Sequence, residues 1–242
     1  EVSRQAIMEA TGCSAGVLAA LIEKSVFEVH EKIVSRFNGE DVVITPDFSF
    51  NAQQQQAFDS IQEQFQSKEV VLLHGVTASG KTQLYIRLIE AQLAQGKNVL
   101  YLLPEIALTA QITDRLKMHF GDKLGVYHSK FNDNERAEVW HKVMKNEFQV
   151  IIGARSSIFL PFQHLGLVVV DEEHESSYKQ YDPAPRYQSR DTAIYLANIH
   201  QAKVLLGSAT PSIESYYNAK ANKFGLVELK ERFGGATLPE IQ

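Results

Sequence analysis

The segment Gly75–Thr82 constrains the fold more than any other part of the chain, because its sequence G-V-T-A-S-G-K-T fits the phosphate-binding loop pattern G-x-x-x-x-G-K-[ST]. In that pattern the glycines let the backbone curl so that its N–H groups point at phosphate oxygens. We expect Lys81 to reach the β- and γ-phosphates of a nucleotide and the Thr82 hydroxyl to bind Mg²⁺. The residues predicted to surround the nucleotide are Gly75, Thr77, Ser79, Gly80, Lys81 and Thr82.

An ordinary glycine-rich turn is the alternative interpretation of this segment, and its surroundings decide between the two. A phosphate loop needs a strand before it and a helix after it. The apolar run Val70–Leu73 predicts the strand, and a helical pattern runs from the loop through Ala94. The surroundings therefore favour a phosphate loop.

Strand-like and helix-like segments alternate along most of the chain. The apolar runs, rich in β-branched residues, are 70–73, 98–102, 124–127, 149–152, 167–170 and 203–206. Helical patterns lie between several of them, through Ala94, around 109–118 and over 135–145. Such alternation predicts an α/β fold in which helices cover both faces of a parallel sheet.

A second motif, Asp171-Glu172-Glu173-His174, directly follows the apolar run 167–170. In parallel sheets of this kind, an acidic residue at the carboxyl end of a buried strand lies beside the phosphate loop. We expect Asp171 to hold Mg²⁺ through water and Glu172 to polarise the attacking water. A solvated acidic loop is the alternative, and the phosphate loop in the same chain argues against it. The string Gly207–Thr210 after a later strand suits a γ-phosphate sensor, or a turn of small residues.

Basic and aromatic side chains are interleaved just past the acidic motif. They are Tyr178, Lys179, Tyr181, Arg186, Tyr187 and Arg190. Aromatic rings stack on bases and cations hold phosphates, so this segment suits single-stranded nucleic acid. A surface loop whose tyrosines pack on the domain explains the same residues equally well. Arg155 and Ser156, at the end of another strand, suit contacts to backbone phosphates.

Composition limits the classes of protein to which these motifs can belong. The single cysteine, Cys13, excludes an internal disulfide and a cysteine-rich zinc site within the 242 residues. We find no apolar run long enough to span a bilayer and no signal peptide at the start, so we expect a cytoplasmic protein. The net charge of −5 argues against a surface that is basic throughout, but it is compatible with a local basic track. Because the chain starts at Glu1, without a methionine, we interpret it as a fragment of a longer protein.

The first 45 residues have a pattern of their own. Helical spacing over 3–10 is followed by a turn that contains Gly12, and by a second helix for which Ser14 is the predicted N-cap. Short strands are predicted at 26–29 and 32–34. This order is typical of a winged helix-turn-helix, which could bind duplex DNA through its second helix. We favour a linker or docking module, because that helix offers no arginine to phosphates.

Taken together and in this order, the motifs resemble those of one family, the primosomal replication-restart helicases (the PriA family) of helicase superfamily 2. The resemblance covers nearly the whole chain, and its most specific segment is Asp171–Gln180. The other segments that carry it are Gly75–Thr82, Leu103–Thr109, His128-Ser129, Gly153–Ser156, Pro185–Tyr187, Arg190-Asp191 and Gly207–Ser212.

The resemblance implies a winged-helix domain over residues 1–45 and a first RecA-like helicase lobe, which binds ATP and Mg²⁺, over 46–242. The intact protein would unwind DNA in the 3′→5′ direction at stalled forks, near the bacterial nucleoid. Its implied partners are single-stranded and forked DNA, single-stranded-DNA-binding protein and primosome proteins, with no membrane.

The resemblance also assigns roles to single residues. Gln54 would contact adenine, and His174 would link the nucleotide site to the aromatic-rich loop after it. Catalytic roles fall to Lys81, Asp171 and Glu172. The residues assigned to DNA are Thr109, Arg155, Ser156, Tyr178, Lys179, Arg186 and Tyr187.

Two departures from the family pattern bear on these expectations. Ala78 stands where the family more often has glycine, and alanine disfavours positive φ. The family's second lobe, with its zinc-binding cysteines and an arginine that reaches across the cleft, is not in this sequence, so zinc is expected only there. The rival interpretation is therefore a module that binds nucleotide and DNA with little catalysis of its own.

Overall fold

The computed structural model describes residues 4–24, 26–27, 48–128 and 130–231. Contacts divide the chain into two units, residues 1–38 and 39–242. The domain boundary expected between residues 45 and 46 lies outside the described residues. Among the helices that the structure describes, none is long and apolar enough to cross a membrane.

The first unit contains the two expected helices, α1 (Arg4–Thr11) and α2 (Ala15–Glu23). The predicted N-cap of α2 is confirmed, because the Ser14 side chain accepts a hydrogen bond from the Val17 N–H. Of the two short strands expected next, only Val26 and Phe27 are described, and they lie in a bend. The winged helix therefore stays a prediction.

The second unit is built on a seven-stranded sheet, within the residues described, with the order β3-β4-β2-β5-β6-β1-β7. Every strand pair in it is parallel. The strands are β1 (Val70–Gly75), β2 (Asn98–Leu102), β3 (Leu124–Tyr127), β4 (Val150–Gly153), β5 (Leu165–Asp171), β6 (Lys203–Ser208) and β7 (Gly225–Leu229). The predicted parallel sheet is thus confirmed.

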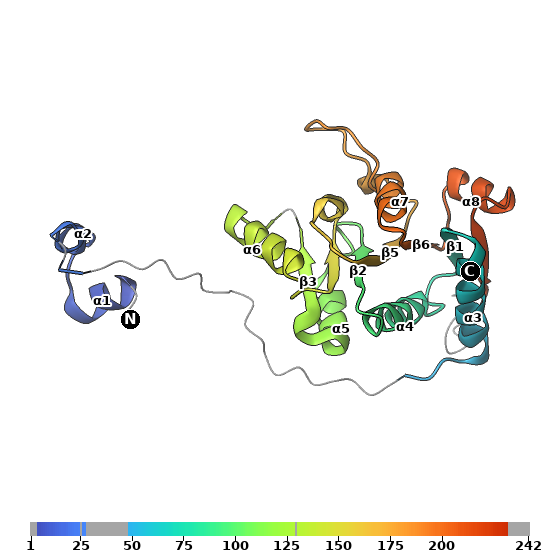
Figure 1. Cartoon of the computed structure of the whole chain (residues 1–242), viewed down its shortest axis with the longest axis horizontal. Helices are drawn as coiled ribbons and strands as arrows, with labels where there is room; N and C mark the ends of the chain where they lie inside the picture. The colour runs from blue at the N-terminus through green and yellow to red at the C-terminus, as the bar shows by residue number, and fades with distance from the viewer. Residues whose placement is uncertain (1–3, 25, 28–47, 129, 232–242) are drawn as a thin grey trace, which may run out of the picture. The chain divides into compact units, whose positions relative to one another are not determined.

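Helices cover both faces of the sheet, as expected (Figure 1). On one face lie α3 (Ala52–Ser67), α4 (Lys81–Leu93) and α5 (Ala110–Phe120). On the other lie α6 (Asp133–Met144), α7 (Ser189–His200) and α8 (Ile213–Lys220). Short 3₁₀ turns are η1 (Gly121–Lys123), η2 (Arg155–Phe159) and η3 (Ser176–Tyr178).

Local sequence explains where several helices begin. Asn51 and Gln54 form a reciprocal capping box at the start of α3, and Asn132 and Glu135 form another at α6. Thr109 and Ser212 cap α5 and α8 with their hydroxyls. These caps satisfy backbone N–H groups that have no partner inside the helix.

The main core lies between the sheet and the face that carries α3, α4 and α5. Leu73 of β1, Val99 of β2 and Val169 of β5 are fully buried there, in one cluster with Leu84 and Ile89 of α4. Burying one such side chain stabilises the fold by about 1.5–3 kcal/mol relative to its exposure. This packing fixes α4, and with it the loop before α4, against the ends of the strands.

Candidate active site and nucleic-acid interface

The phosphate loop connects the end of β1 to the first residue of α4. It has the expected strand before it and helix after it. Gly80 has φ +87° and Ala78 has φ +62°, so both residues are in the left-handed region. The strain expected at Ala78 is therefore present, because an L side chain disfavours this conformation.

Lys81 lies inside the loop that precedes it. Its Nζ donates to the Gly75 carbonyl across 2.9 Å and lies 3.9 Å from Oε1 of Glu172. A Cβ at Gly75 would come within 3.1 Å of the Lys81 side chain, so the close approach depends on glycine. The Ser79 hydroxyl is buried and has no hydrogen-bond partner among the described residues. Thr77 is exposed and Thr82 is half-buried at the start of α4.

Asp171 ends β5, as expected, and its carboxylate is held by two buried tyrosines. Tyr85 Oη donates to Oδ1 across 3.0 Å, and Tyr101 Oη donates to Oδ2 across 3.1 Å. Tyr85 belongs to α4 and Tyr101 to β2, and both are fully buried. Sequence reasoning missed both residues; the signal for Tyr101 was a hydroxyl between the leucines of a buried strand.

The environment of this carboxylate changes its acidity. Burial raises the pKa of Asp171 from 3.8 to about 6, and the negative charge of Glu172 acts in the same direction. The hydrogen bonds from Tyr85 and Tyr101 and the charge of Lys81 oppose that rise. Burial, followed by the charge of Asp171, raises the pKa of both tyrosines, so both stay hydroxyl donors.

Glu172 lies between the phosphate loop and His174. Its backbone has φ +46°, an uncommon conformation for a residue with a side chain. Its Oε1 approaches Lys81 Nζ, and its Oε2 lies 3.7 Å from His174 Nδ1. A backbone conformation of this cost is often retained where it aims a functional side chain.

His174 contacts the end of β6. Its Nδ1 lies 2.8 Å from Ser208 Oγ, and its Nε2 lies 3.3 Å from Thr210 Oγ1. These contacts bring the string Gly207–Thr210 to the nucleotide side of the sheet. The link expected from His174 to the aromatic-rich loop is not among its contacts in the described chain, and the histidine connects Glu172 to β6 instead.

The basic residue Arg190 is not available to nucleic acid, contrary to the sequence-based interpretation. It is 8% exposed, and its Nη1 donates to Glu173 Oε2 across 3.0 Å and to Ser212 Oγ across 2.8 Å. Its Nε donates to Asp191. Arg190 therefore supports the fold behind the acidic motif.

The predicted contact of Tyr178 with DNA is likewise wrong, because its ring has no exposed face on which a base could stack. It is 1% exposed, and its hydroxyl donates to the carbonyl oxygens of Asp171, at 2.7 Å, and Leu102, at 3.1 Å. The tyrosine therefore joins the ends of β5 and β2. For Tyr178, the alternative interpretation is therefore correct: the tyrosine packs on the domain.

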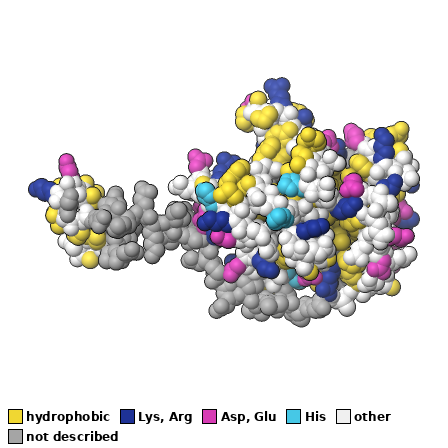
Figure 2. All heavy atoms as spheres, in the orientation of Figure 1, with side chains coloured by type: hydrophobic (Ala, Val, Ile, Leu, Met, Phe, Trp, Pro, Cys, Tyr) yellow, Lys and Arg dark blue, Asp and Glu magenta, His cyan; other side chains and the backbone are white. Residues whose placement is uncertain are grey.

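The segment after Tyr178 forms a protruding loop that leads into α7 (Figure 1). Lys179 and Gln188 pair at its base, and the Gln180 N–H donates to the Tyr187 carbonyl across 2.9 Å. Residues 181–186 are exposed, including Arg186. Figure 2 shows hydrophobic side chains gathered on this protrusion together with basic ones. This loop keeps the composition expected of a single-strand contact.

Arg155 and Tyr187 lie where this loop meets η2. Arg155 Nη1 lies 3.4 and 3.3 Å from the carbonyl oxygens of Ser177 and Lys179, so its guanidinium braces the base of the loop. The Tyr187 ring packs edge-on against Phe159, with centroids 5.1 Å apart. Phe159 is 51% exposed, and the sequence analysis did not single it out. Of the other residues predicted to contact DNA, Thr109 is exposed and Ser156 is half-buried.

Gln54 lies next to the phosphate loop but is fully buried. Its Nε2 donates to Gln83 Oε1 across 2.6 Å, and its Oε1 accepts from the Asn51 N–H. A Cβ on Gly80 would overlap the Gln54 amide, so the two are in direct contact. A groove of ≈ 490 Å³ opens beside Gln83 and is also lined by Phe48, Gln111, Asp114, Arg115, Met118 and His119.

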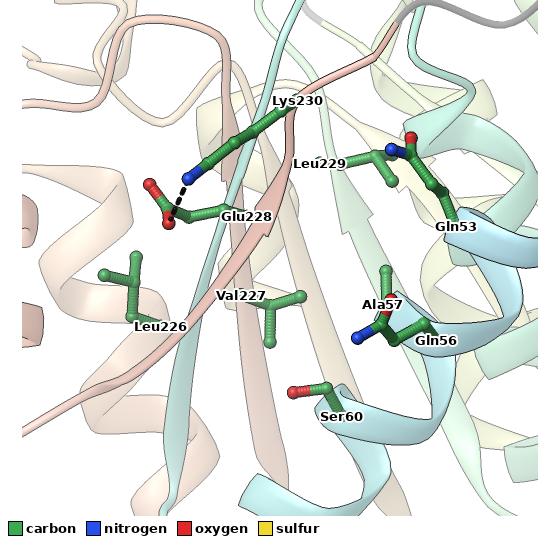
Figure 3. Close-up of a pocket in the computed structure, with 9 residues that line it drawn as sticks. All are labelled: Gln53, Gln56, Ala57, Ser60, Leu226, Val227, Glu228, Leu229 and Lys230. Carbon is green, nitrogen blue, oxygen red and sulfur yellow. Dashed lines mark ion pairs between the residues drawn. The ribbon is translucent and has the colours of Figure 1, made fainter.

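Another groove, of ≈ 320 Å³, lies between α3 and the edge strand β7. Figure 3 shows its lining residues, with Gln53, Gln56 and Ser60 on the helix and the exposed ion pair Glu228–Lys230 on the strand side. None of the predicted site residues lines it. The described residues contain no cluster of three or more His, Cys, Asp or Glu side chains that could hold a metal.

The fold and the two motifs at its strand ends define a RecA-like, nucleotide-binding P-loop domain. The family model for DEAD/DEAH box helicases matches residues 51–219, and the chain belongs to this family.

Curated relatives narrow the similarity further. The chain is 41% identical over 235 residues to the replication restart protein PriA of Bacillus subtilis, and 42% identical over 242 residues to that of Chlamydia trachomatis. These matches cover 96% and 97% of this chain but 29% and 32% of the relatives, so the chain spans about a third of their length.

Solved structures show the same fold at lower identity. RecG bound to a three-way DNA junction matches with a TM-score of 0.58 and 20% identity, over 92% of this chain and 26% of that one. The helicase Lhr of Mycobacterium smegmatis, bound to single-stranded DNA and AMP-PNP, matches with a TM-score of 0.53 and 19% identity, over 74% of this chain and 25% of that one.

Proposed function

We propose that this chain is the ATP-binding lobe of a DNA helicase that restarts stalled replication forks. The observation that carries the proposal is the approach of Lys81 to Glu172, 3.9 Å apart, which joins the phosphate loop to the acidic motif in one site. The similarity of the chain to replication restart proteins supports DNA at stalled forks as the substrate. In the intact protein, hydrolysis would drive 3′→5′ movement along single-stranded DNA.

The residues of the site divide the work of phosphoryl transfer between them. Lys81 exchanges its bond to the Gly75 carbonyl for the β- and γ-phosphates, and the backbone N–H groups of the loop cradle the same phosphates. Glu172 orients the attacking water, because its carboxylate faces Lys81 on one side and lies 3.7 Å from His174 on the other. Ser208 and Thr210 hold that histidine, so loss of the γ-phosphate can be passed to β6.

The donor set fits Mg²⁺. This ion keeps several waters and uses one or two protein oxygens together with substrate phosphates, rather than a closed cage of side chains. Asp171 and Thr82 offer that number of oxygens near the phosphate loop. When bound, the ion would neutralise charge on the phosphates.

The adenine base of the nucleotide and the DNA have separate candidate surfaces. The groove beside Gln83 could hold adenine. Gln54 is buried, so it would act by holding the Gln83 side chain rather than by contacting adenine itself. Single-stranded DNA would lie along Thr109, Ser156 and the protruding loop, with Arg186 on phosphates and Tyr187 on a base. Arg155 and Lys179 would act mainly at the base of that loop. Single-stranded-DNA-binding protein and primosome proteins are proposed partners of the intact protein.

A second candidate function is a module that binds nucleotide and DNA but turns over slowly. Within the described residues, the basic side chains found beside Glu172 are Lys81 and His174, and neither is an arginine. An arginine supplied from another lobe can contribute on the order of 10³–10⁵ in rate. The 242 residues would then bind both ligands without appreciable hydrolysis.

Measurement of ATP binding and ATP hydrolysis by the 242-residue chain, with and without single-stranded DNA, tests both candidates. We expect ATP binding in the wild type and its loss in Lys81→Ala; unchanged binding in that variant would refute the nucleotide site. Turnover stimulated by DNA, and abolished in Glu172→Gln, would favour a complete motor over the module. Binding of both ligands without turnover would favour the module.

A further inference from the structure

The carboxylate of Asp171 is held from two directions. Tyr85 reaches Oδ1 from α4, the helix that follows the phosphate loop, and Tyr101 reaches Oδ2 from the neighbouring strand β2. The two rings pack edge to face, with centroids 5.5 Å apart. Each oxygen therefore has its own donor, and the pair of bonds fixes the plane of the carboxylate.

Space for one of these donors is created by Gly207 on β6. A Cβ at Gly207 would overlap the Tyr85 hydroxyl, and it would lie 3.5 Å from Asp171 Oδ1. Gly207 is paired with Asp171 across β5 and β6. The Tyr85 bond thus requires a residue without a side chain at this position of the sheet.

The arrangement does more than satisfy buried hydroxyls. Tyr178 shows how this fold satisfies such a group with main-chain carbonyls alone. Tyr85 and Tyr101 instead converge on one carboxylate, although they come from different elements. The Glu172 N–H also donates to Oδ1, across 3.1 Å. A carboxylate has about four lone-pair directions, so these three donors leave Oδ2 able to accept a further bond.

We propose that Tyr85 and Tyr101 are positioning residues, which hold the Asp171 carboxylate in the orientation that receives the water shell of the nucleotide-bound Mg²⁺. The inference rests on the proposed role of Asp171 in holding that ion. Outer-shell partners of this kind orient the groups that meet a metal, and their loss commonly weakens metal affinity by about 10–100-fold.

Removal of single hydroxyls tests the inference with little change of shape. In Tyr85→Phe, Tyr101→Phe and the double variant, a fluorescent ADP analogue is titrated at pH 8, first in EDTA and then over a series of Mg²⁺ concentrations. We expect nucleotide affinity in EDTA to stay within about twofold of wild type. The Mg²⁺ midpoint is the Mg²⁺ concentration that gives half of the Mg²⁺-dependent gain in nucleotide affinity. It should rise about 10-fold or more in the double variant.

Two variants control for general damage and for the proposed function itself. Tyr178→Phe removes a buried hydroxyl that donates to the main-chain oxygens of Asp171 and Leu102 but not to the Asp171 carboxylate. It should leave the Mg²⁺ midpoint unchanged. Asp171→Asn should raise the midpoint at least as much as the double variant. If Asp171→Asn has no effect, the proposed metal role of Asp171 fails.

The inference itself is overturned by either of two results. One is an unchanged Mg²⁺ midpoint in the Tyr85→Phe/Tyr101→Phe double variant while Asp171→Asn shifts it. The other is an equal shift in Tyr178→Phe. Should the double variant not fold, Gly207→Ala provides a second route, because its methyl group displaces the Tyr85 hydroxyl. It should shift the midpoint in the same direction as Tyr85→Phe.

Discussion

Arg190 Nη1 donates to Glu173 Oε2 across 3.0 Å, and the carboxylate of Glu173 is fully buried. The same carboxylate accepts from the Ser212 N–H and hydroxyl and from the Ser215 hydroxyl. The third residue of the acidic motif therefore points away from the nucleotide, and it fixes α7 and the start of α8 behind the site.

Removal of Arg190 should be strongly destabilising. Arg190→Ala leaves a buried charge without its cation, and such a loss typically costs about 3–5 kcal/mol. Urea unfolding followed by circular dichroism measures the free energy of unfolding. Arg186→Ala, which removes an exposed arginine three residues before α7, is the matched control and should change it by less than about 0.5 kcal/mol. Equal effects of the two substitutions would contradict the structural role of Arg190.

Relief of strain in the phosphate loop should stabilise the protein. Ala78 has φ +62°, where an L residue pays roughly 1–2 kcal/mol that glycine avoids, while glycine adds about 0.5–1 kcal/mol of unfolded-state entropy. Ala78→Gly should therefore raise the free energy of unfolding by about 0.5 kcal/mol or more, with ATP binding retained. Ala94→Gly, at an exposed residue with φ −62°, should lower it instead. A loss of stability in Ala78→Gly would contradict the strain.

Patterns along the sequence predicted the strands and the phosphate loop, but not the contacts that cross the sheet. The apolar runs marked β1 to β6 because buried parallel strands are apolar on both faces. The short strand β7 and the helices α3, α7 and α8 were missed, since their sequences carry weaker apolar patterns. Local patterns also cannot show that Tyr101, 70 residues before Asp171, lies on the neighbouring strand.

The aromatic segment shows a second limit of the sequence. Tyr178 and Tyr187 belong to one polar stretch, and residue type alone gives both the same expected role. Tyr178 ends η3, and its hydroxyl points inward to the carbonyls of two strand ends, whereas the Tyr187 ring, at the base of the loop, packs against Phe159. Which face a loop residue takes depends on tertiary contacts, so the sequence could not separate them.

The buried carboxylate should make stability depend on pH. Because burial raises the pKa of Asp171 from 3.8 to about 6, the folded state binds this proton more tightly than the unfolded chain does. The contribution to stability is therefore full below about pH 4 and is lost as pH rises through about 6. In thermal melts without nucleotide or Mg²⁺, the wild type should lose stability between pH 4.5 and 7.5 relative to Asp171→Asn. A constant difference across that range would contradict the raised pKa.

The half-buried Tyr187 and the exposed Phe159 should contribute to binding of single-stranded DNA. Stacking of a base on an aromatic ring is worth about 1–3 kcal/mol by alanine substitution, which corresponds to about 5–150-fold in affinity. Tyr187→Ala and Phe159→Ala should each weaken binding of a labelled oligonucleotide by a factor in that range, measured by fluorescence anisotropy at fixed salt. Tyr217→Ala removes a tyrosine that is 68% exposed on α8, and it should leave the affinity unchanged. Since Tyr187 packs edge-on against Phe159, the two losses should be less than additive in the double variant. Unchanged affinity in both single variants would place the DNA elsewhere on the lobe.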